Sequence, residues 1–533
     1  MSVAVQLVLV VFTSISAMAQ SSGVTADLAG TVSDQTGAVL PGVMITVTAN
    51  STGLTRSVVS EEQGLFLIQN LPSGTYAVKA ELTGFTTVTL NSVTLTLGQR
   101  VNLPIRMSVG SVTETVTVNE ESTPLLETSK TEISSLVNER AINDMPINIR
   151  NPLQFILTTP GTTAQRTTTG SNYSFGGGRA RNNSSNIDGV DNNDDAIRGF
   201  MAQPSLDAVK EFQVLASNYS AEFGRASGGV VNTILKSGTN NINGSAFYYI
   251  RDRAFAANNF FVNANSANPP NFKPYFRQQQ FGGAIGGPIK KNKLFFFGSY
   301  EHFRTNAFSV VTISQANADI INDVLAGNYG SVPGLGPNFP RGIKLGYTKI
   351  GGPGSFARTQ RRNIVVDKID WQPTGSDSFY FRHLFNRNEN STPGSALNDN
   401  TRNGSDFKGD TSSYVGSYTR IISPHTLNEL RYQFAPSTSG NIVEDPIGPG
   451  INISGVASIG RNLNQPQGRS QRRSQFIDNL SWQTGKHQIK FGTDINRVRR
   501  ISSLPGTNAG NLGAQDCCAF QKAHWCPEPI RSP

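Results

Sequence analysis

The sequence predicts a mainly β chain in three parts: an N-terminal β-sandwich, a compact α+β domain, and part of a large antiparallel transmembrane β-barrel. Three observations lead to this expectation. Glycine makes up 52 of the 533 residues and charged residues only 16%, a composition that favours strands and turns over helices. Short strand-like segments separated by turn residues fill residues 24–108. From residue 242 onward, apolar and polar residues alternate in segments of about ten residues, as in membrane barrels.

The first residues are typical of an exported protein. Residues 3–15 form an apolar run that Ala17-Met18-Ala19 follows, so residues 1–19 are expected to be a signal peptide. No Lys or Arg precedes Arg56, which leaves a buried first strand as the alternative. Because no run of about 18 apolar residues occurs, a transmembrane helix is not expected.

Residues 24–108 contain strands at regular spacing, which predicts a β-sandwich. Residues 30–43 read Gly-x-Val-x-Asp-x-x-Gly-x-x-Leu-Pro-Gly-Val, and residues 71–78 read Leu-Pro-Ser-Gly-Thr-Tyr-Ala-Val. These motifs resemble the carboxypeptidase regulatory-like domain. The resemblance implies an immunoglobulin-like or transthyretin-like sandwich, a fold that is grouped with carbohydrate-binding-like folds.

Residues 109–127 form a polar linker with a β-prone strip, Thr-Glu-Thr-Val-Thr-Val, at 113–118. Main-chain hydrogen bonds would let such a strip add to the edge of a partner's sheet. The alternative is that the strip is the last strand of the sandwich. The sequence favours neither interpretation over the other.

Residues 128–241 are expected to form the α+β domain. An Asn-Pro pair at 151–152 predicts a short helix over residues 152–157, and residues 186–191 predict a strand and a turn. Within residues 221–238, three glycines in six residues punctuate two short apolar runs, which predicts a bend, a bulge or the close approach of another backbone. These glycines are Gly224, Gly228 and Gly229.

This domain resembles the plug domain of TonB-dependent outer-membrane transporters, in the Oar-like subgroup that carries a regulatory-like sandwich. The resemblance spans residues 24–510 and rests on four stretches in the expected order, at residues 145–152, 187–192, 209–212 and 222–232. The residues of the plug motif are Asp188, Gly189, Gly224, Gly228, Gly229 and Asn232.

The resemblance implies an active importer in the bacterial outer membrane, surrounded by lipid, rather than an enzyme. A plug would close the barrel, an extracellular ligand would bind from outside, and an inner-membrane TonB-type energy-coupling protein would pull on a strip near the plug. The candidate strip, or TonB box, consists of Glu114, Thr115, Val116, Thr117 and Val118. Carbohydrate is one candidate ligand because of the fold group of the sandwich. The alternative is a surface protein that binds a glycan or another polymer, or mediates adhesion, with the barrel as its anchor.

About nine strands are expected in a partial barrel at residues 242–510. They lie near 242–252, 274–287, 293–304, 361–371, 378–388, 411–422, 426–435, 473–483 and 486–498. Short and long connections alternate between them, as in outer-membrane barrels. Barrels of the resembled family have about 22 strands, so a truncated chain is expected, and residues 511–533, which lack alternation, are expected to be an aberrant, frameshifted tail. A further alternative is therefore a non-functional fragment.

Other kinds of site are not expected. The net charge of +9 is scattered, without the basic stripe of a nucleic-acid-binding protein. The cysteines and a nearby His fit no common zinc spacing; these residues are Cys517, Cys518, His524 and Cys526. The acidic segment at 188–195 fails the EF-hand template, because the sixth and twelfth positions from Asp191 are Ala196 and Ala202. Neither a metal, nor a cofactor, nor a catalytic residue is expected.

Overall fold

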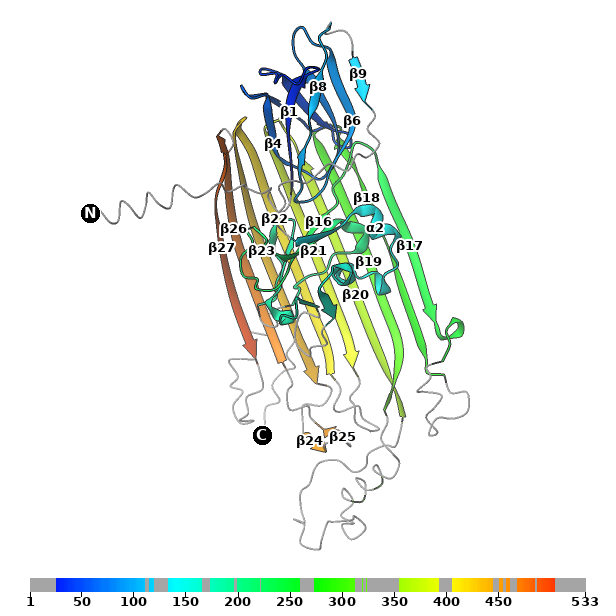
Figure 1. The fold of residues 1–533 in the computed structure, drawn as a ribbon. Helices are drawn as coiled ribbons and strands as arrows, with labels where there is room; N and C mark the ends of the chain where they lie inside the picture. Colours follow the sequence, from blue (N-terminus) through cyan, green and yellow to red (C-terminus); the bar gives the residue numbers. More distant parts are fainter. Residues whose placement is uncertain are drawn as a thin grey trace, which may run out of the picture.

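A computed structural model describes most of the chain. The described residues are 25–110, 115–118, 133–164, 173–195, 199–220, 222–258, 273–311, 319, 323, 354–392, 405–443, 450–453, 457–460, 467–484 and 487–503. The expected signal peptide and the expected aberrant tail both lie outside these residues. In Figure 1, a sandwich (blue) stands at one end of a long sheet (green to red), and a smaller domain (cyan and green) lies against the sheet.

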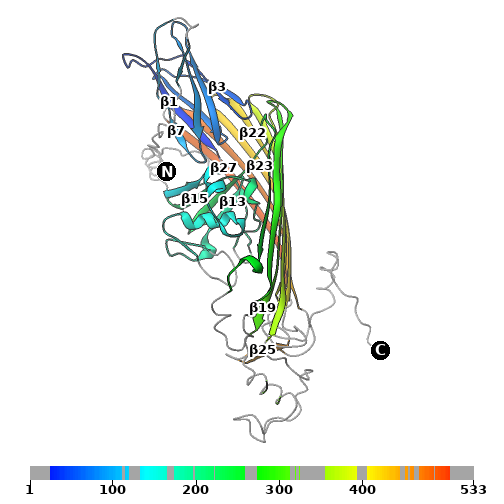
Figure 2. The ribbon, with the colours of Figure 1, turned by 90° about the vertical axis from the view of Figure 1, so that its right-hand side faces the viewer.

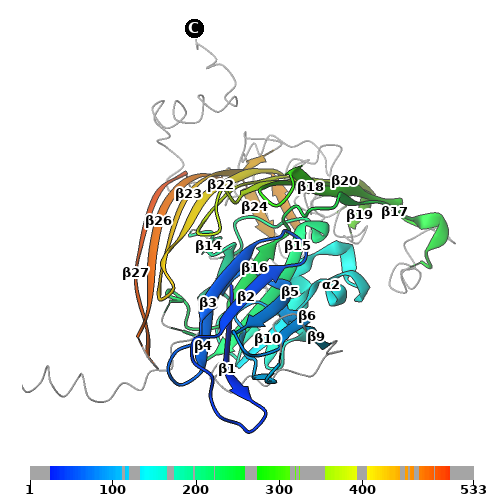
Figure 3. The same cartoon turned by 90° about the horizontal axis from the view of Figure 1, so that it is seen from above.

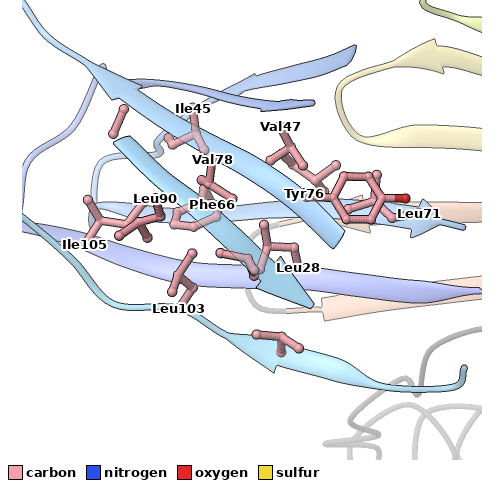
Figure 4. Packing of buried hydrophobic residues seen from close by; sticks show 14 of the residues in the cluster. Leu28, Ile45, Val47, Phe66, Leu71, Tyr76, Val78, Leu90, Leu103 and Ile105 are labelled. Carbon is pink, nitrogen blue, oxygen red and sulfur yellow. The ribbon is translucent and has the colours of Figure 1, made fainter. Parts of the chain in front are cut away.

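The sandwich contains two sheets. Its strands are β1 (Ala26–Asp34), β2 (Met44–Ala49), β3 (Thr55–Val59), β4 (Leu65–Leu71), β5 (Gly74–Glu81), β6 (Thr87–Leu95), β7 (Arg100–Asn102), β8 (Ile105–Met107) and β9 (Thr115–Val118). One sheet has the order β4-β1-β7, with β8 also paired to β1, and the other has the order β3-β2-β5-β6-β9. Alternate side chains of each strand point between the sheets, where Leu28, Ile45 and Val78 are fully buried (Figure 4). The predicted β-sandwich is confirmed.

Residues 133–241 form a smaller α+β domain, hereafter the plug. Its strands are β10 (Ile133–Val137), β11 (Thr162–Ala164), β12 (Tyr173–Phe175), β13 (Ser184–Ile187), β14 (Val190–Asp191), β15 (Val209–Ser217) and β16 (Val230–Leu235). Its helices are α2 (Glu139–Asp144) and the 3-10 helices η1 (Asn148–Arg150), η2 (Pro152–Thr158), η3 (Ala180–Asn182) and η4 (Leu206–Ala208). The main sheet has the order β10-β15-β16-β13-β14. The predicted helix at 152–157 is confirmed as η2, whose first turn is capped by the Asn151 side chain, 3.0 Å from the Leu153 amide.

Nine strands form a single antiparallel sheet within the part of the chain that the structure describes, hereafter the barrel sheet. In order along the sheet they are β17 (Asn243–Asp252), β18 (Phe276–Lys290), β19 (Leu294–Val311), β20 (Gly354–Trp371), β21 (Asp377–Thr392), β22 (Ser405–Ser423), β23 (Thr426–Val443), β26 (Gln467–Thr484) and β27 (His487–Ser503). The 3-10 helix η5 (Arg253–Phe255) follows β17, and β24 (Gly450–Ile453) and β25 (Ala457–Gly460) pair with each other between β23 and β26. None of the described helices combines the length and hydropathy of a membrane span.

The barrel sheet curves around the plug. Seen from above, it forms an arc with the plug and the sandwich on its concave side (Figure 3), and from the side it is a single layer behind the plug (Figure 2). The sheet is open in the described residues, with β17 and β27 as its two edges. The plug is therefore held by one wall of strands.

The two faces of the barrel sheet differ as the sequence predicts. On β23, Glu429, Arg431 and Gln433 are buried against the concave side, whereas Tyr432 and Phe434 are exposed on the convex side. Polar residues therefore face the plug and apolar residues face outward, which confirms the predicted alternation of a membrane barrel with a polar interior.

The strands are longer than their alternation indicates. The sequence predicts a strand near 411–422, whereas β22 spans Ser405–Ser423. A hydrogen-bonded ladder can continue beyond the lipid, where water contacts both faces and no longer selects alternating residues. The short predicted connections are confirmed between β18 and β19, between β20 and β21, and between β22 and β23.

Candidate functional site

The plug motif begins at a hairpin that touches the barrel sheet. Asp188 and Gly189 join β13 to β14 with φ of 50° and 78°, the positive values that a type I′ turn requires at both central positions. The Asp188 carboxylate accepts a hydrogen bond from the Leu235 amide at 2.9 Å and lies 3.6 Å from Nε of Arg382 on β21. The Tyr380 hydroxyl donates to the Asp188 carbonyl at 3.0 Å. The turn thus brings a buried carboxylate to a buried arginine of the barrel wall.

The acidic segment after this turn binds arginines. Arg473 on β26 is fully buried and forms ion pairs with Asp191 and, at 2.7 Å, with Asp195. Arg225 of the plug pairs with the same two carboxylates, at 2.7 Å from Asp191. Asn496 on β27 donates a further hydrogen bond to Asp191 at 3.0 Å. These contacts show how the carboxylates of the segment are used: they hold a plug loop against two barrel strands.

The Glu-Phe-Gly-Arg segment of the motif supplies the other half of this contact. Glu222 forms an ion pair with Lys490 on β27 at 2.6 Å, while Arg225 supports the acidic segment from the plug side. Glu222 therefore attaches the plug to β27 directly, and Arg225 orders the carboxylates that hold Arg473 of β26. The sequence singles out this segment for its glycines and gives no local signal for the contacts of its charged residues.

Of the glycines Gly224, Gly228 and Gly229, two are closely packed. A Cβ on Gly228 would lie 2.2 Å from the Asn183 side-chain oxygen, and one on Gly229 would lie 2.7 Å from the Phe175 ring. Both positions are closely packed, but chiefly against side chains and not against the backbone that the sequence leads one to expect. Gly224 differs, because a Cβ there would have no atom within 4 Å.

Asn232 occupies the middle of the plug sheet on β16. Its side chain accepts a hydrogen bond from Asn186 on β13 at 3.2 Å and donates to Gln213 on β15 at 3.4 Å. Because β13 and β15 flank β16, this amide links three strands and orders the plug sheet from which the Asp188 turn projects.

A second cluster of charges joins the plug to the other half of the barrel sheet. Glu301 on β19 accepts a hydrogen bond from Gln280 at 2.9 Å and lies 3.6 Å from Arg362 and 3.9 Å from Arg150. Arg150, on η1 of the plug, also pairs with Asp207 at 2.8 Å. Sequence reasoning missed these residues. The available signal was the charged Glu301 at a strand position that faces the plug.

Two neighbouring plug residues attach the sandwich. The Glu211 carboxylate on β15 accepts a hydrogen bond from the Leu97 amide at 2.8 Å, and the Lys210 ammonium group donates to the Ser73 carbonyl. Burial raises the pKa of Glu211 above its ordinary value of 4.5, against the opposing effect of Lys210. Burial likewise lowers the pKa of Lys210. Both groups lose solvation at a contact between domains, and the sequence offers no periodic signal for it.

The sandwich also touches the short turns of the barrel sheet. The Asn240 amide, just before β17, donates to the Ser51 carbonyl at 2.8 Å. A Cβ on Gly53 would lie 3.5 Å from the Cβ of Asn292, in the turn between β18 and β19. The sandwich thus stands over the end of the barrel sheet that carries the short turns, which is the periplasmic end in outer-membrane barrels.

A cavity of about 700 Å³ lies between the sandwich, the plug and the concave face of the barrel sheet. Charged side chains from all three parts line it, among them Arg56 of the sandwich, Lys210 of the plug and Glu429 of the sheet. The arrangement is a polar chamber that the sandwich covers on the periplasmic side.

The candidate energy-coupling strip is an edge strand of the sandwich. Strand β9 runs parallel to β6, with Thr115 opposite Thr87 and Val118 opposite Leu90. This pairing agrees with the alternative that the strip is the last strand of the sandwich. Glu114 lies outside the described residues. The strip is therefore placed on the sandwich, whereas the other motif residues lie in the plug.

The plug is attached by buried charges to a curved antiparallel sheet with polar residues inside and apolar residues outside. These features define part of a plugged outer-membrane β-barrel, open in the described residues. Residues 234–333 and 349–522 match the outer membrane beta barrel domain, and residues 27–108 match the carboxypeptidase regulatory-like domain. The chain belongs to the outer membrane beta barrel family, whose members lie in the bacterial outer membrane.

Relatives of known identity agree with this assignment. The chain is 27% identical over 316 residues to the TonB-dependent transporter Oar of Myxococcus xanthus. The matched region covers 55% of this chain and 28% of the relative. The outer-membrane transporter YddB of Escherichia coli has the same fold, with a TM-score of 0.50, 11% identity, and coverage of 69% of this chain and 48% of its own. The siderophore receptor PirA of Acinetobacter baumannii aligns with a TM-score of 0.46 and 15% identity over 70% of this chain and 49% of its own. The chain thus spans about half of these solved structures and less of the curated relative.

Proposed function

We propose that the protein acts in TonB-dependent uptake of an extracellular ligand across the outer membrane. Homology to Oar supports this proposal, and one structural observation carries it. The candidate coupling strip, β9, lies at a sheet edge next to the connection that leads to β10, which is the edge strand of the plug sheet. A pull on β9 therefore reaches the plug sheet through the chain itself.

The strand pairing suggests how such a pull would act. Strand β9 has a sheet partner on one side only, β6, in the described residues, so a partner strand can add to its other edge through main-chain hydrogen bonds. Strand β10 pairs with β15 through five residues. Detaching an edge strand breaks one ladder, which is easier than opening the buried ion pairs between the plug and the barrel sheet.

The same path ends at the polar chamber. Strand β15 carries Lys210 and Glu211, which hold the sandwich over the chamber. Loss of the β10 ladder would loosen β15, and with it the cover of the sandwich. In this proposal the ligand leaves through the chamber to the periplasm, and no catalytic group is needed.

Binding of the coupling protein tests the proposal. The probe is the purified periplasmic domain of a TonB-type protein from the same bacterium, added to the full chain in detergent. Because the proposed contact uses main-chain donors at the free edge of β9, the double variant Val116→Pro/Thr117→Pro removes whichever of the two amides faces that edge, and it is expected to weaken binding at least tenfold.

The matched control is Val116→Thr/Thr117→Val, which changes the same side chains and keeps every main-chain donor. It is expected to bind as the parent does. Equal binding by the proline variant would show that β9 is not the coupling strip, and the proposal would then lose its structural basis.

A further inference from the structure

The convex face of the barrel sheet has a groove that the proposed transport does not use. Its volume is about 530 Å³, and its walls come from β19 to β23. Gly416 on β22 lies at its centre, with Phe381 of β21 and Tyr432 of β23 as its direct neighbours across the two ladders. A Cβ on Gly416 would have no atom within 4 Å, so the missing side chain leaves an open gap.

The dimensions of the gap suit a hydrocarbon chain. Phe381 and Tyr432 stand two strand spacings apart, about 10 Å, on either side of the bare backbone of Gly416. Both are about half exposed, although their sheet lies in a membrane whose lipid must cover them. A single extended acyl chain fits a channel of this width.

One end of the groove is built from stacked aromatic rings. Trp371 stacks on Phe379 with ring centroids 5.1 Å apart, and Phe379 stacks on Tyr418 at 4.5 Å. Amphipathic aromatic rings are typical of the level of the lipid headgroups. The rings lie near the turn between β20 and β21, which belongs to the short-turn, periplasmic end of the sheet.

A positive charge follows the aromatic rings on the same face. Arg420 is two residues beyond Tyr418 on β22, and its side chain is 59% exposed. It lies 3.8 Å from Asp377 and donates to the Tyr418 hydroxyl at 3.4 Å. Most of the guanidinium is therefore open to an anion, and arginine matches the geometry of a phosphate well.

We propose that this groove is a binding site for a phospholipid of the periplasmic leaflet, with one acyl chain over Gly416 and the phosphate at Arg420. The apolar channel, the aromatic rings and the cation follow one another from the membrane interior toward the periplasm, in the order of acyl chain, headgroup boundary and phosphate. The site holds one lipid in a fixed place on the barrel wall, in addition to the lipid that surrounds the sheet.

Fluorescence of Trp371 measures this binding directly, since the residue lines the groove. The parent for the test is the full chain with Trp482→Phe and Trp525→Phe, purified in detergent and titrated with a phospholipid brominated on its acyl chains. We expect quenching that saturates at about one lipid per protein. Gly416→Leu fills the gap and is expected to raise the half-saturating lipid concentration at least tenfold.

Two controls distinguish lipid binding in the groove from the general covering of the convex face by lipid. Gly298→Leu adds the same side chain to the outward face of β19, outside the groove, and is expected to leave the titration unchanged. A brominated diacylglycerol, which lacks the phosphate, is expected to bind the parent more weakly than the phospholipid does. It is expected to bind the parent and Arg420→Gln equally well. This second comparison keeps the test decisive if Gly416→Leu fails to fold.

Two results would overturn the proposal. Quenching that rises without saturation and is the same in Gly416→Leu would mean that lipid only solvates the face. Dimerisation of the parent that Gly416→Leu abolishes, without lipid-dependent quenching, would instead assign the groove to a second copy of the chain.

Discussion

Neighbouring residues of the barrel sheet have opposite environments because the strand period is two. Arg472 is exposed on the convex face, whereas Arg473 is fully buried among plug carboxylates. In the sequence the two form one dense basic pair, and only the register of β26 shows that one of them holds the plug. A buried charge is costly unless its partners are present, so the two arginines should respond differently to the same substitution.

Removal of Arg473 tests its role in holding the plug. Arg473→Ala removes the ion pairs of Asp191 and Asp195 with the barrel sheet, and we expect a loss of about 3–5 kcal/mol of stability, as for other broken buried pairs. Guanidinium unfolding of the protein in detergent measures the change. Arg472→Ala is the matched control and should alter the stability by no more than about 0.5 kcal/mol; similar losses in both variants would contradict the assignment.

The plug glycines make a second comparison. Gly229→Ala places a methyl group against the Phe175 ring, at 2.7 Å without rearrangement, and overpacking of this kind costs about 1–3 kcal/mol. Gly224→Ala meets no atom within 4 Å and should be neutral or slightly stabilising, because alanine restricts the unfolded chain. Thermal unfolding of the two variants decides the point, and a Gly229→Ala protein as stable as the parent would refute the close contact.

The contact of Glu211 with the sandwich predicts a dependence on pH. Because burial raises the pKa of Glu211 in the docked state, docking is most stable below the ordinary value of 4.5 and weakens as pH rises through the raised value. Lys210 and Glu139 also act on this carboxyl. Glu211→Gln keeps an acceptor for the Leu97 amide without the charge, so it should dock more firmly at neutral pH and show a flatter pH profile. Hydrogen exchange at the Leu97 amide measures docking; an unchanged profile in the variant would contradict this account.

At the scale of elements, the sequence predicts helices and strands that follow a local pattern. It does not predict contacts between residues that are distant along the chain. Alternation located the strands of the barrel sheet, and the Asn-Pro pair located η2, because both signals are local. Alternation could not give the full length of β22, because only the part of the strand that faces lipid has alternating polar and apolar residues. The sequence does not decide the pairing of β9 with β6, since a strip of Thr and Val suits the edge of a partner's sheet as well as the edge of the sandwich.

The charged contacts were the least predictable part of the candidate site. Glu222, Arg225 and Glu301 find their partners on strands that are far away in sequence, and no spacing rule connects such pairs. Gly228 and Gly229 stand out in the sequence because clustered glycines are a local signal, although the atoms closest to them are side-chain atoms. The docking contact of Glu211 could not be predicted, because a single carboxylate in a strand cannot be distinguished in the sequence from a surface residue.

At the scale of the whole molecule, the sandwich is part of the closure at the periplasmic end. It contacts the plug through Leu97 and Ser73 and the barrel sheet through Ser51 and Gly53. Because these contacts reach two different parts, the sandwich cannot move from the plug without also leaving the barrel turns. A cross-link between the sandwich and the sheet should therefore fix the whole assembly.

A disulfide between Gly53→Cys and Asn292→Cys tests this arrangement, in a chain whose three cysteines are replaced by Ser. A Cβ on residue 53 would lie 3.5 Å from the Cβ of residue 292, within disulfide range, although its φ of 71° costs about 1–2 kcal/mol for a residue other than glycine. We expect the bond to form in the oxidising periplasm and to appear as a mobility shift that a reductant reverses. Gly37→Cys with Asn292→Cys is the control and should stay reduced; a bond in the control alone would mean that the sandwich sits elsewhere.

The central claim is that β9 receives the pull of an inner-membrane coupling protein, and trapping that contact in living cells tests it most directly. Single cysteines at Thr115, Val116, Thr117 and Val118 are paired with cysteines along the coupling protein's own edge strand, in cells with an intact or a collapsed proton gradient. The account predicts disulfide-linked complexes at these positions, with the yield changing when the gradient is collapsed. Correctly inserted protein that gives no complex at any of the four positions would contradict it.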